Sequence, residues 1–176
     1  MKFIFDHGST LVLSICLSIY ALVAQVIRPV DAASTGSDRH LIDRGRYLVK
    51  TTGCNDCHTP LYSERSGDVP EARWLVGSSL GWQGPWGTTY PINLRRLVSY
   101  LSANEWLEIA RRPSRPPMPW FALRDMTDED LTAIYAFIRS LGSIGEEAPA
   151  FVPPGQKVRT PVIRFPDQND ATAITQ

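Results

Sequence analysis

Hydrophobic positions recur at helical spacing in four separate stretches of the chain. These stretches are residues 38–53, 93–101, 102–112 and 128–141. Their apolar positions include Leu41, Ile42, Leu48, Val49, Leu94, Leu97, Val98, Leu101, Trp106, Leu107, Ile109, Leu131, Ile134, Tyr135, Ile138 and Leu141. In each stretch these residues fall on one face of a 3.6-residue period, so we predict four amphipathic helices packed around one core.

Local signals mark where these helices begin and end. Ser102-x-x-Glu105 is a capping box, in which a hydroxyl and a carboxylate satisfy the free backbone N–H groups of the first turn. Thr127-x-x-Asp130 has the same form with Asp in place of Glu, and Gly142 is suited to the left-handed residue that follows a helix. Gly45 costs helix stability unless another element packs closely there.

Two other regions lack a helical period. Residues 61–90 are rich in Gly, Ser and Pro and should be mostly loop, although their aromatic residues are too many for a free linker. Residues 142–176 are polar and Pro-rich, and we expect this extension to run along the surface or fray rather than form a packed domain. Phe151, Val162, Ile163 and Phe165 are the residues that could attach it.

The N-terminus has the pattern of an export signal. Lys2 precedes an uncharged run over residues 11–27, and small residues follow at Ala32 and Ala33. This pattern predicts a secretory signal peptide over residues 1–33 and a periplasmic protein. The run is near the lower length limit of a membrane-spanning helix, so an uncleaved anchor in the inner membrane is the alternative.

The charge balance excludes one class of partner. The chain carries 18 Lys and Arg against 18 Asp and Glu. Removal of residues 1–33 takes away two residues of each sign, so the remaining domain is also neutral. Broad electrostatic binding to nucleic acid is therefore not expected.

The stretch Cys54-x-x-Cys57-His58 carries the chemistry. A closed zinc site needs four ligands, and beyond this stretch residues 34–176 offer only His40 as a further Cys or His. A redox dithiol would need a βαβ pattern, and a plain disulfide would leave His58 unexplained. Covalent attachment of haem explains all three residues: each thiol bonds one vinyl group, and the imidazole binds the iron. We therefore predict that Cys54 and Cys57 bind haem c covalently.

The second iron ligand should be a methionine, because His and Met commonly hold the iron of an electron-transfer haem. Met126 is explained as a hydrophobic staple, since it precedes the cap residue Thr127 and can pack on Leu131. Met118 lies in Arg-Pro-Pro-Met-Pro-Trp, where prolines exclude both helix interior and central strand. A stiff loop of this kind can present one thioether, so we predict His58 and Met118 as the axial ligands.

These residues resemble a known family. The segments GRYLVKTTGCNDCHTP, GPWGTTYPINL and RPPMPWFALRDMTDEDLTAIYAFIRSL look like a single-haem class I cytochrome c, of the bacterial group with a Pro-rich methionine loop. The resemblance spans residues 38–141. It implies an all-α cytochrome c fold over residues 34–141, with about four helices, long loops and one covalent haem. It also implies single-electron transfer beside a dehydrogenase, and it suggests that Tyr135 packs on Gly45.

Further roles follow as hypotheses. Trp86, Tyr90 and Asn93 are predicted to contact the haem rim or its propionates, although the aromatic residues of this region could equally form loop core under the haem. His58 should donate its second N–H to a nearby proline carbonyl such as that of Pro60.

A basic rim of four arginines either docks an acidic patch of a redox partner or is simply solvated: Arg111, Arg112, Arg115 and Arg124. Partners would be a dehydrogenase subunit or a respiratory component, and the polypeptide itself should not be an enzyme. An open iron site would instead indicate a gas sensor or haem enzyme.

Overall fold

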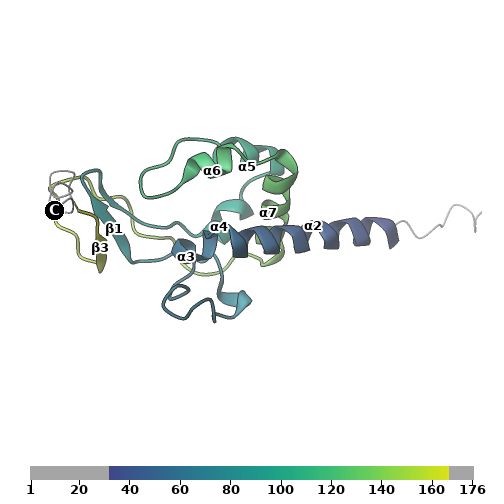
Figure 1. Cartoon of the computed structure of the whole chain (residues 1–176), viewed down its shortest axis with the longest axis horizontal. Helices are drawn as coiled ribbons and strands as arrows, with labels where there is room; N and C mark the ends of the chain where they lie inside the picture. The colour runs from purple at the N-terminus through teal and green to yellow at the C-terminus, as the bar shows by residue number, and fades with distance from the viewer. Residues whose placement is uncertain (1–31, 167–176) are drawn as a thin grey trace, which may run out of the picture. The chain divides into compact units, whose positions relative to one another are not determined.

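The computed structural model describes residues 32–166 of the chain (Figure 1). Contacts divide the chain into the units Met1–Ser37 and Asp38–Gln176, and apart from the start of α2 the features below belong to the second unit. The helices are α2 (Ala32–Thr51), α3 (Cys54–His58), α4 (Leu94–Ser99), α5 (Ala103–Ala110), α6 (Trp120–Arg124) and α7 (Asp128–Ser140). A 3₁₀ turn covers Glu71–Arg73, and the strands are β1 (Gly81–Gly84), β2 (Gly87–Thr89) and β3 (Val162–Arg164).

The four predicted helices are present as α2, α4, α5 and α7. The capping box at α5 is complete, because the Ser102 side chain accepts from the Glu105 N–H and the Glu105 carboxylate accepts from the Ser102 N–H. Thr127 caps α7 by accepting from the Asp130 N–H, and Gly142 follows that helix with φ 70°. Two helices of five residues each, α3 and α6, were not predicted as separate elements.

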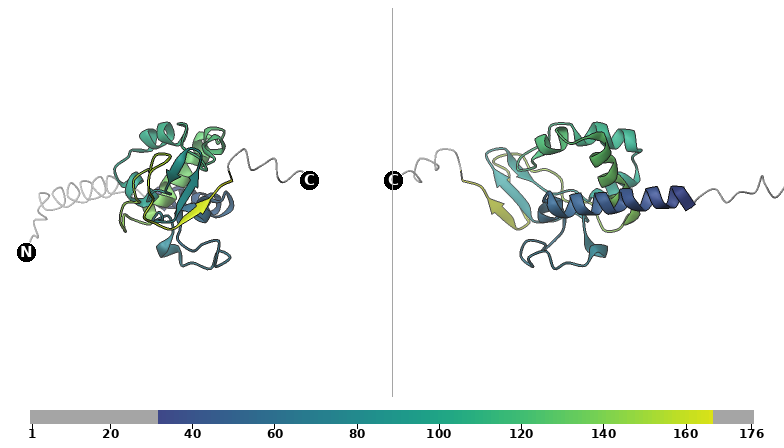
Figure 2. Two further views of the ribbon diagram at one scale, coloured as in Figure 1. Left: turned by 90° about the vertical axis from the view of Figure 1, so that its left-hand side faces the viewer. Right: turned by 45° about the vertical axis from the view of Figure 1, so that its right-hand side comes forward.

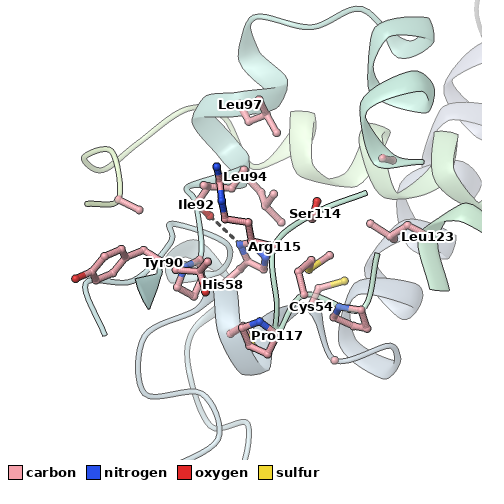
Figure 3. Close-up of a pocket in the computed structure, with 18 of the residues that line it drawn as sticks. Cys54, His58, Tyr90, Ile92, Leu94, Leu97, Ser114, Arg115, Pro117 and Leu123 are labelled. Atoms are coloured by element: carbon pink, nitrogen blue, oxygen red, sulfur yellow. Dashed lines mark hydrogen bonds between the residues drawn. The ribbon is translucent and has the colours of Figure 1, made fainter. Parts of the chain in front are cut away.

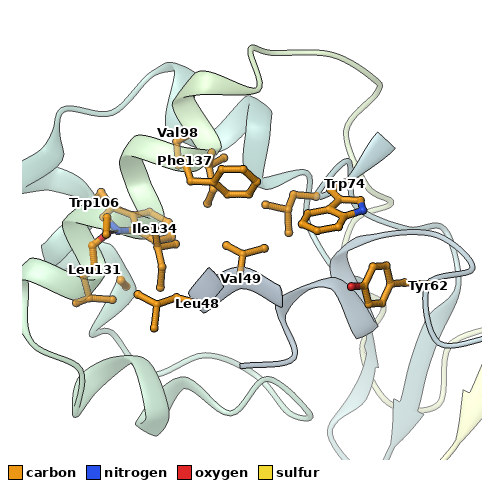
Figure 4. Packing of buried hydrophobic residues seen from close by; sticks show 13 residues of the cluster. Leu48, Val49, Tyr62, Trp74, Val98, Trp106, Leu131, Ile134 and Phe137 are labelled. Carbon is orange, nitrogen blue, oxygen red and sulfur yellow. Dashed lines mark hydrogen bonds between the residues drawn. The ribbon is translucent and has the colours of Figure 1, made fainter. Parts of the chain in front are cut away.

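The core forms where α2 crosses α7 (Figure 4). Val49, Leu131 and Phe137 are fully buried there. Gly45 is the point of closest approach, because a Cβ at that position would lie 1.9 Å from the Ala133 carbonyl oxygen and 2.8 Å from the Phe137 Cβ. The expected close packing on Gly45 is therefore found, but the expected partner Tyr135 is wrong. The Tyr135 hydroxyl instead donates to the Leu101 carbonyl at 2.7 Å.

The predicted all-α class is confirmed only in part, because a small sheet accompanies the helices. Strands β1 and β2 pair antiparallel, and Gly84 and Gly87 close the hairpin around Pro85 and Trp86. Strand β3 pairs parallel with β1 on its other side, in the order β2-β1-β3 (Figure 2). The pairing joins residues 81–83 to residues 162–164, so the C-terminal extension carries ordered structure up to residue 166. The Phe165 ring packs on Trp82 and Trp86, at centroid distances of 5.8 and 5.3 Å.

The long loop after α3 joins the core at two aromatic residues. Tyr62 and Trp74 are both 7% exposed, and their rings meet edge to face at 5.8 Å. The Trp74 indole N–H donates to the Val69 carbonyl at 2.8 Å, so this indole is committed to the loop. For Trp74, the loop-core alternative is the one that the structure supports.

Within residues 32–166, no helix is both long enough and apolar enough to span a bilayer. The predicted signal peptide or anchor over residues 1–33 falls almost wholly outside the described residues.

Candidate haem site

The helix α3 places the Cys-x-x-Cys-His stretch at one wall of a cavity. It begins after Gly53, whose φ of 78° suits glycine and turns the chain out of α2. Cys54 and Cys57 both line the cavity, and both thiols are free. Burial raises the pKa of each thiol, so both are held in the neutral form. Among residues 32–166, no three Cys, His, Asp or Glu side chains are grouped as they would be around a zinc ion.

His58 is held in the form that a metal ligand needs. Its side chain faces the cavity and the residue is 7% exposed. Its Nδ1 donates to the Ile92 carbonyl at 2.8 Å, which fixes the tautomer and leaves Nε2 as the free lone pair (Figure 3). Burial lowers the His58 pKa, which keeps the imidazole neutral. The expected carbonyl partner exists, but it belongs to Ile92 and not to Pro60.

Gly77 allows the Ile92–Asn93 segment, whose Ile92 carbonyl accepts from His58, to lie close to α3. Its N–H donates to the His58 carbonyl at 2.8 Å, and its φ is +77°. A Cβ here would lie 2.7 Å from the Asn93 backbone nitrogen and 2.9 Å from the Ile92 carbonyl carbon. Only glycine therefore allows the chain to pass between His58 and the Ile92–Asn93 backbone without displacing one of them.

A second group of hydrogen bonds, centred on Thr59, supports the same wall. The Thr59 hydroxyl donates to the Asn55 side-chain oxygen at 2.7 Å and accepts from the Leu75 N–H at 2.8 Å. The Leu75 carbonyl in turn accepts from the Leu94 N–H at 3.0 Å. This side of the cavity is thus tied together through three segments that are distant in sequence.

A second wall of the cavity is the Pro-rich loop that carries Met118. Its backbone bonds are local: the Met118 N–H donates to the Arg115 carbonyl, and the Trp120 N–H donates to the Met118 carbonyl. One bond from outside reaches it, from the Thr89 hydroxyl of β2 to the Pro116 carbonyl at 2.6 Å. Helix α6 begins directly after Pro119, at the end of the loop. The prediction of a loop at residues 115–119 is confirmed.

The cavity between the two walls has a volume of about 510 Å³. Figure 3 shows His58, Tyr90 and Leu94 among the side chains around it. Further lining residues are mostly apolar and come from α2, α4, α5 and α7: Val49, Leu97, Trp106, Ile109, Ala110, Ile134 and Ile138. Two thiols, a neutral imidazole and the thioethers of Met118 and Met126 thus share one apolar chamber. This donor set fits a covalently attached haem.

The remaining predicted residues are placed unevenly. Tyr90 lines the cavity, but its hydroxyl is bonded to Thr160 at 2.6 Å. Trp86 is not among the lining residues and packs on Phe165. Asn93 does not line it either, because its side chain caps α4 and donates to two carbonyls of residues 144 and 146. Met126 does line the cavity, so position alone does not separate it from Met118. The haem-rim roles remain predictions.

Most of the predicted arginine rim is already paired. Arg111 forms an ion pair with Asp128, Arg112 with Glu108, and Arg124 with Asp125. Their charges are largely offset locally, which favours the alternative of solvated arginines at these three positions. Arg115 differs, because its guanidinium lies 4.1 Å above the Phe151 ring.

Sequence reasoning missed Ile92, Gly77 and Thr89, which hold the two walls. A carbonyl acceptor carries no side-chain signal, so Ile92 could not be found from the sequence. Gly77 could only be suspected as one glycine among several. Trp82, which lines the cavity, was not separated from the other aromatic residues.

Comparison with known proteins places the chain in a family. The model of the family "Cytochrome c" matches residues 42–142, which is more than half of the chain. The protein belongs to the cytochrome c family, whose members carry covalently bound haem c.

The curated relatives include cytochrome subunits of dehydrogenases. The fructose dehydrogenase cytochrome subunit of Gluconobacter japonicus is 27% identical over 122 residues, covering 63% of this chain and 23% of that protein. A nicotinate dehydrogenase subunit of Pseudomonas putida is 27% identical over 136 residues, covering 70% and 11%. The cytochrome c subunit of the quinone alcohol dehydrogenase of Gluconobacter oxydans is 29% identical over 117 residues, covering 60% and 22%.

The matched part of this chain spans less than a quarter of the length of each of these relatives. No solved structure gives a significant match.

Proposed function

We propose that this protein is a monohaem c-type cytochrome that passes single electrons from a dehydrogenase to a respiratory acceptor. The observation that carries the proposal is the convergence of Cys54, Cys57, His58 and Met118 on one apolar cavity. Membership of the cytochrome c family and the names of the curated relatives support it. In this role the protein is an electron carrier or an electron-transfer subunit, and the polypeptide performs no catalysis of its own.

Each residue at the cavity has a separate role. Cys54 and Cys57 would hold the haem through two thioether bonds, and His58 and Met118 would bind its iron. Haem c supplies an iron that exchanges one electron between its ferrous and ferric states. The Ile92 carbonyl orients the His58 ring and raises its basicity as a ligand. The apolar side chains exclude water, so little solvent reorganises when the charge on the iron changes.

The proposed setting is the periplasm, reached through the signal in residues 1–33 or with that segment kept as an anchor. In this arrangement residues 34–141 form the cytochrome domain and residues 142–176 its extension. The relatives named above support a dehydrogenase as the electron donor. An alternative function as a gas sensor or haem enzyme would require the Met118 bond to be labile.

The experiment is to produce the full chain with c-type maturation machinery and to count its covalent haem. A denaturing gel stained for haem and a pyridine haemochrome assay should give one haem per chain, and a potentiometric titration should follow a one-electron curve. The variant Cys54→Ser/Cys57→Ser should lose the stain. A wild-type chain without covalent haem, or with more than one, would overturn the proposal.

A further inference from the structure

A segment outside the family match lines the haem cavity. Residues 148–151, called the strap here, lie beyond residue 142, where the match to cytochrome c ends. All four of them nevertheless line the same cavity as His58 and Met118. The strap is therefore part of the chamber wall, although it belongs to the Pro-rich extension.

The strap is pinned at both ends. Before it, the Asn93 side-chain amide donates to the Ile144 carbonyl at 2.8 Å and to the Glu146 carbonyl at 3.1 Å. After it, Val152 and Thr88 exchange two backbone hydrogen bonds of 3.0 and 2.8 Å. Gly87 permits this pairing, because a Cβ there would lie 2.4 Å from the Val152 carbonyl oxygen. These bonds give the strap a fixed position against the cavity.

The strap provides a platform for Arg115. The Arg115 guanidinium lies 4.1 Å from the centroid of the Phe151 ring, which is a close cation–π contact. Among residues 32–166, Arg115 is the only Arg, Lys, Asp or Glu that lines the cavity, and no ion pair is found for it in this part of the chain. Figure 3 shows Arg115 with His58 and Tyr90 around the chamber.

The charge of the cavity matters because haem is not neutral at its rim. Each haem carries two propionate carboxylates, on the side of the ring away from the vinyl groups that the cysteines bond. A carboxylate beside an apolar chamber needs a cation or several hydrogen-bond donors. Arg115 can offer a planar guanidinium with paired N–H donors, which suits a carboxylate.

We propose that Arg115, positioned by Phe151 of the strap, binds a haem propionate and so makes the C-terminal extension a working part of the haem site. This inference rests on the proposed function, because it requires a covalent haem in the cavity. Arg115 contacts the cofactor directly, and Phe151 is the residue that positions Arg115. The family-matched region alone would lack the platform.

The sign of the expected effect follows from electrostatics. A cation beside the propionate favours its ionised form and lowers its pKa. Without that cation the propionate ionises at higher pH, and its negative charge is uncompensated once it does. An uncompensated negative charge near the iron favours the ferric state. Arg115→Gln should therefore lower the midpoint potential at neutral and alkaline pH. It should also shift to higher pH the range over which the midpoint potential falls.

The test is a potentiometric titration of the holoprotein over a pH series. Arg115→Gln should show both changes, Arg115→Lys should largely restore the wild-type curve, and Phe151→Leu should shift it in the same direction by less. Arg112→Gln is the matched control, because Arg112 lies in the same region but is paired with Glu108 and does not line the cavity. The haem stain and the methionine–iron charge-transfer band confirm that each variant is folded.

The outcomes separate this inference from the proposed function. If the wild-type chain carries covalent haem but Arg115→Gln titrates like Arg112→Gln, the role of Arg115 is refuted and the cytochrome assignment stands. If Arg115→Gln shifts and Arg115→Lys does not restore the curve, a charge interaction with the propionate is also refuted. If the wild-type chain carries no covalent haem, both proposals are lost.

Discussion

The two walls of the haem cavity are held in different ways. On the His58 side, hydrogen bonds join segments that are distant in sequence: His58 to Ile92, Gly77 to His58, and Leu75 to Thr59. On the Met118 side, the loop bonds mainly to itself, and Thr89 supplies one hydrogen bond from another element. The imidazole is therefore fixed by the tertiary fold, whereas the thioether is presented by a proline-stiffened loop. We therefore expect the bond between the Met118 sulfur and the iron to break more easily than the bond between His58 and the iron.

The largest effect is expected from Gly77→Ala. The substitution adds a Cβ within 3 Å of the Ile92–Asn93 backbone and places alanine at a φ of +77°. Left-handed strain and overpacking together should lower the free energy of unfolding by about 2–5 kcal/mol. Urea denaturation of the holoprotein measures this. Gly155→Ala is the matched control, because its φ is +78° and no atom lies within 4 Å of its added Cβ. Equal losses of unfolding free energy in both variants would show that the tight fit around Gly77 does not stabilise the protein.

Arg95→Met tests the support behind that wall. Arg95 is 4% exposed and donates to the carbonyls of Gly142, Ala72 and Leu141, which ties α4 to the end of α7. The methionine keeps the apolar stem but leaves buried carbonyls without donors, so the loss should be about 2–3 kcal/mol. Thermal and urea unfolding measure it. Arg112→Gln, at an exposed ion pair, should cost less than about 1 kcal/mol. If Arg95→Met left the free energy of unfolding unchanged, these hydrogen bonds would not be what ties α4 to the end of α7.

Thr89→Val addresses the Met118 side. It removes the hydroxyl that donates to the Pro116 carbonyl, so the loop loses its one bond from β2. Stability should fall by about 0.5–1.5 kcal/mol. More specifically, added imidazole should displace the methionine ligand at lower concentration, followed through the methionine–iron charge-transfer band. Thr51→Val is the control, since its hydroxyl bonds within α2. An unchanged imidazole titration would show that this bond does not restrain the loop.

The smallest effect concerns Glu105, in the helix α5 that supplies Trp106 and Ile109 to the cavity. Hydrogen bonds from the Ser102 N–H and hydroxyl lower the Glu105 pKa. A lowered folded-state pKa gives stability that is present above the unfolded pKa and is lost as pH falls through the folded pKa. Glu105→Gln should therefore be slightly less stable than wild type at neutral pH, and the two should converge in acid. A constant difference across this range would count against the linkage.

Local signals in the sequence were sufficient for four of the helices, α2, α4, α5 and α7. Ser102 with Glu105, and Thr127 with Gly142, marked helix ends because capping depends on neighbours within one turn. The sequence also predicted His58 and Met118 as axial ligands; both side chains line one cavity, and their role as ligands stays a prediction.

Contacts between distant segments were missed. The pairing of β1 with β3 joins segments about eighty residues apart, and neither has a strong strand pattern. The partner of Gly45 depends on the crossing of α2 and α7, which selected Ala133 over the expected Tyr135. The partner of His58 is a backbone carbonyl, which any residue could have supplied. The strap lay outside the recognised domain, so its place in the cavity could not be inferred.

The central claim is that His58 and Met118 are the two axial ligands of one covalent haem. The most direct test is the optical spectrum of the oxidised protein and of the reduced protein with and without carbon monoxide, for wild type, Met118→Ala and Met126→Ala. Met126 is the matched control because it also lines the cavity. We predict that wild type and Met126→Ala keep the methionine–iron charge-transfer band and ignore carbon monoxide, whereas Met118→Ala loses the band and binds the gas. Loss of the band in Met126→Ala alone, or ready binding of carbon monoxide by wild type, would contradict the account.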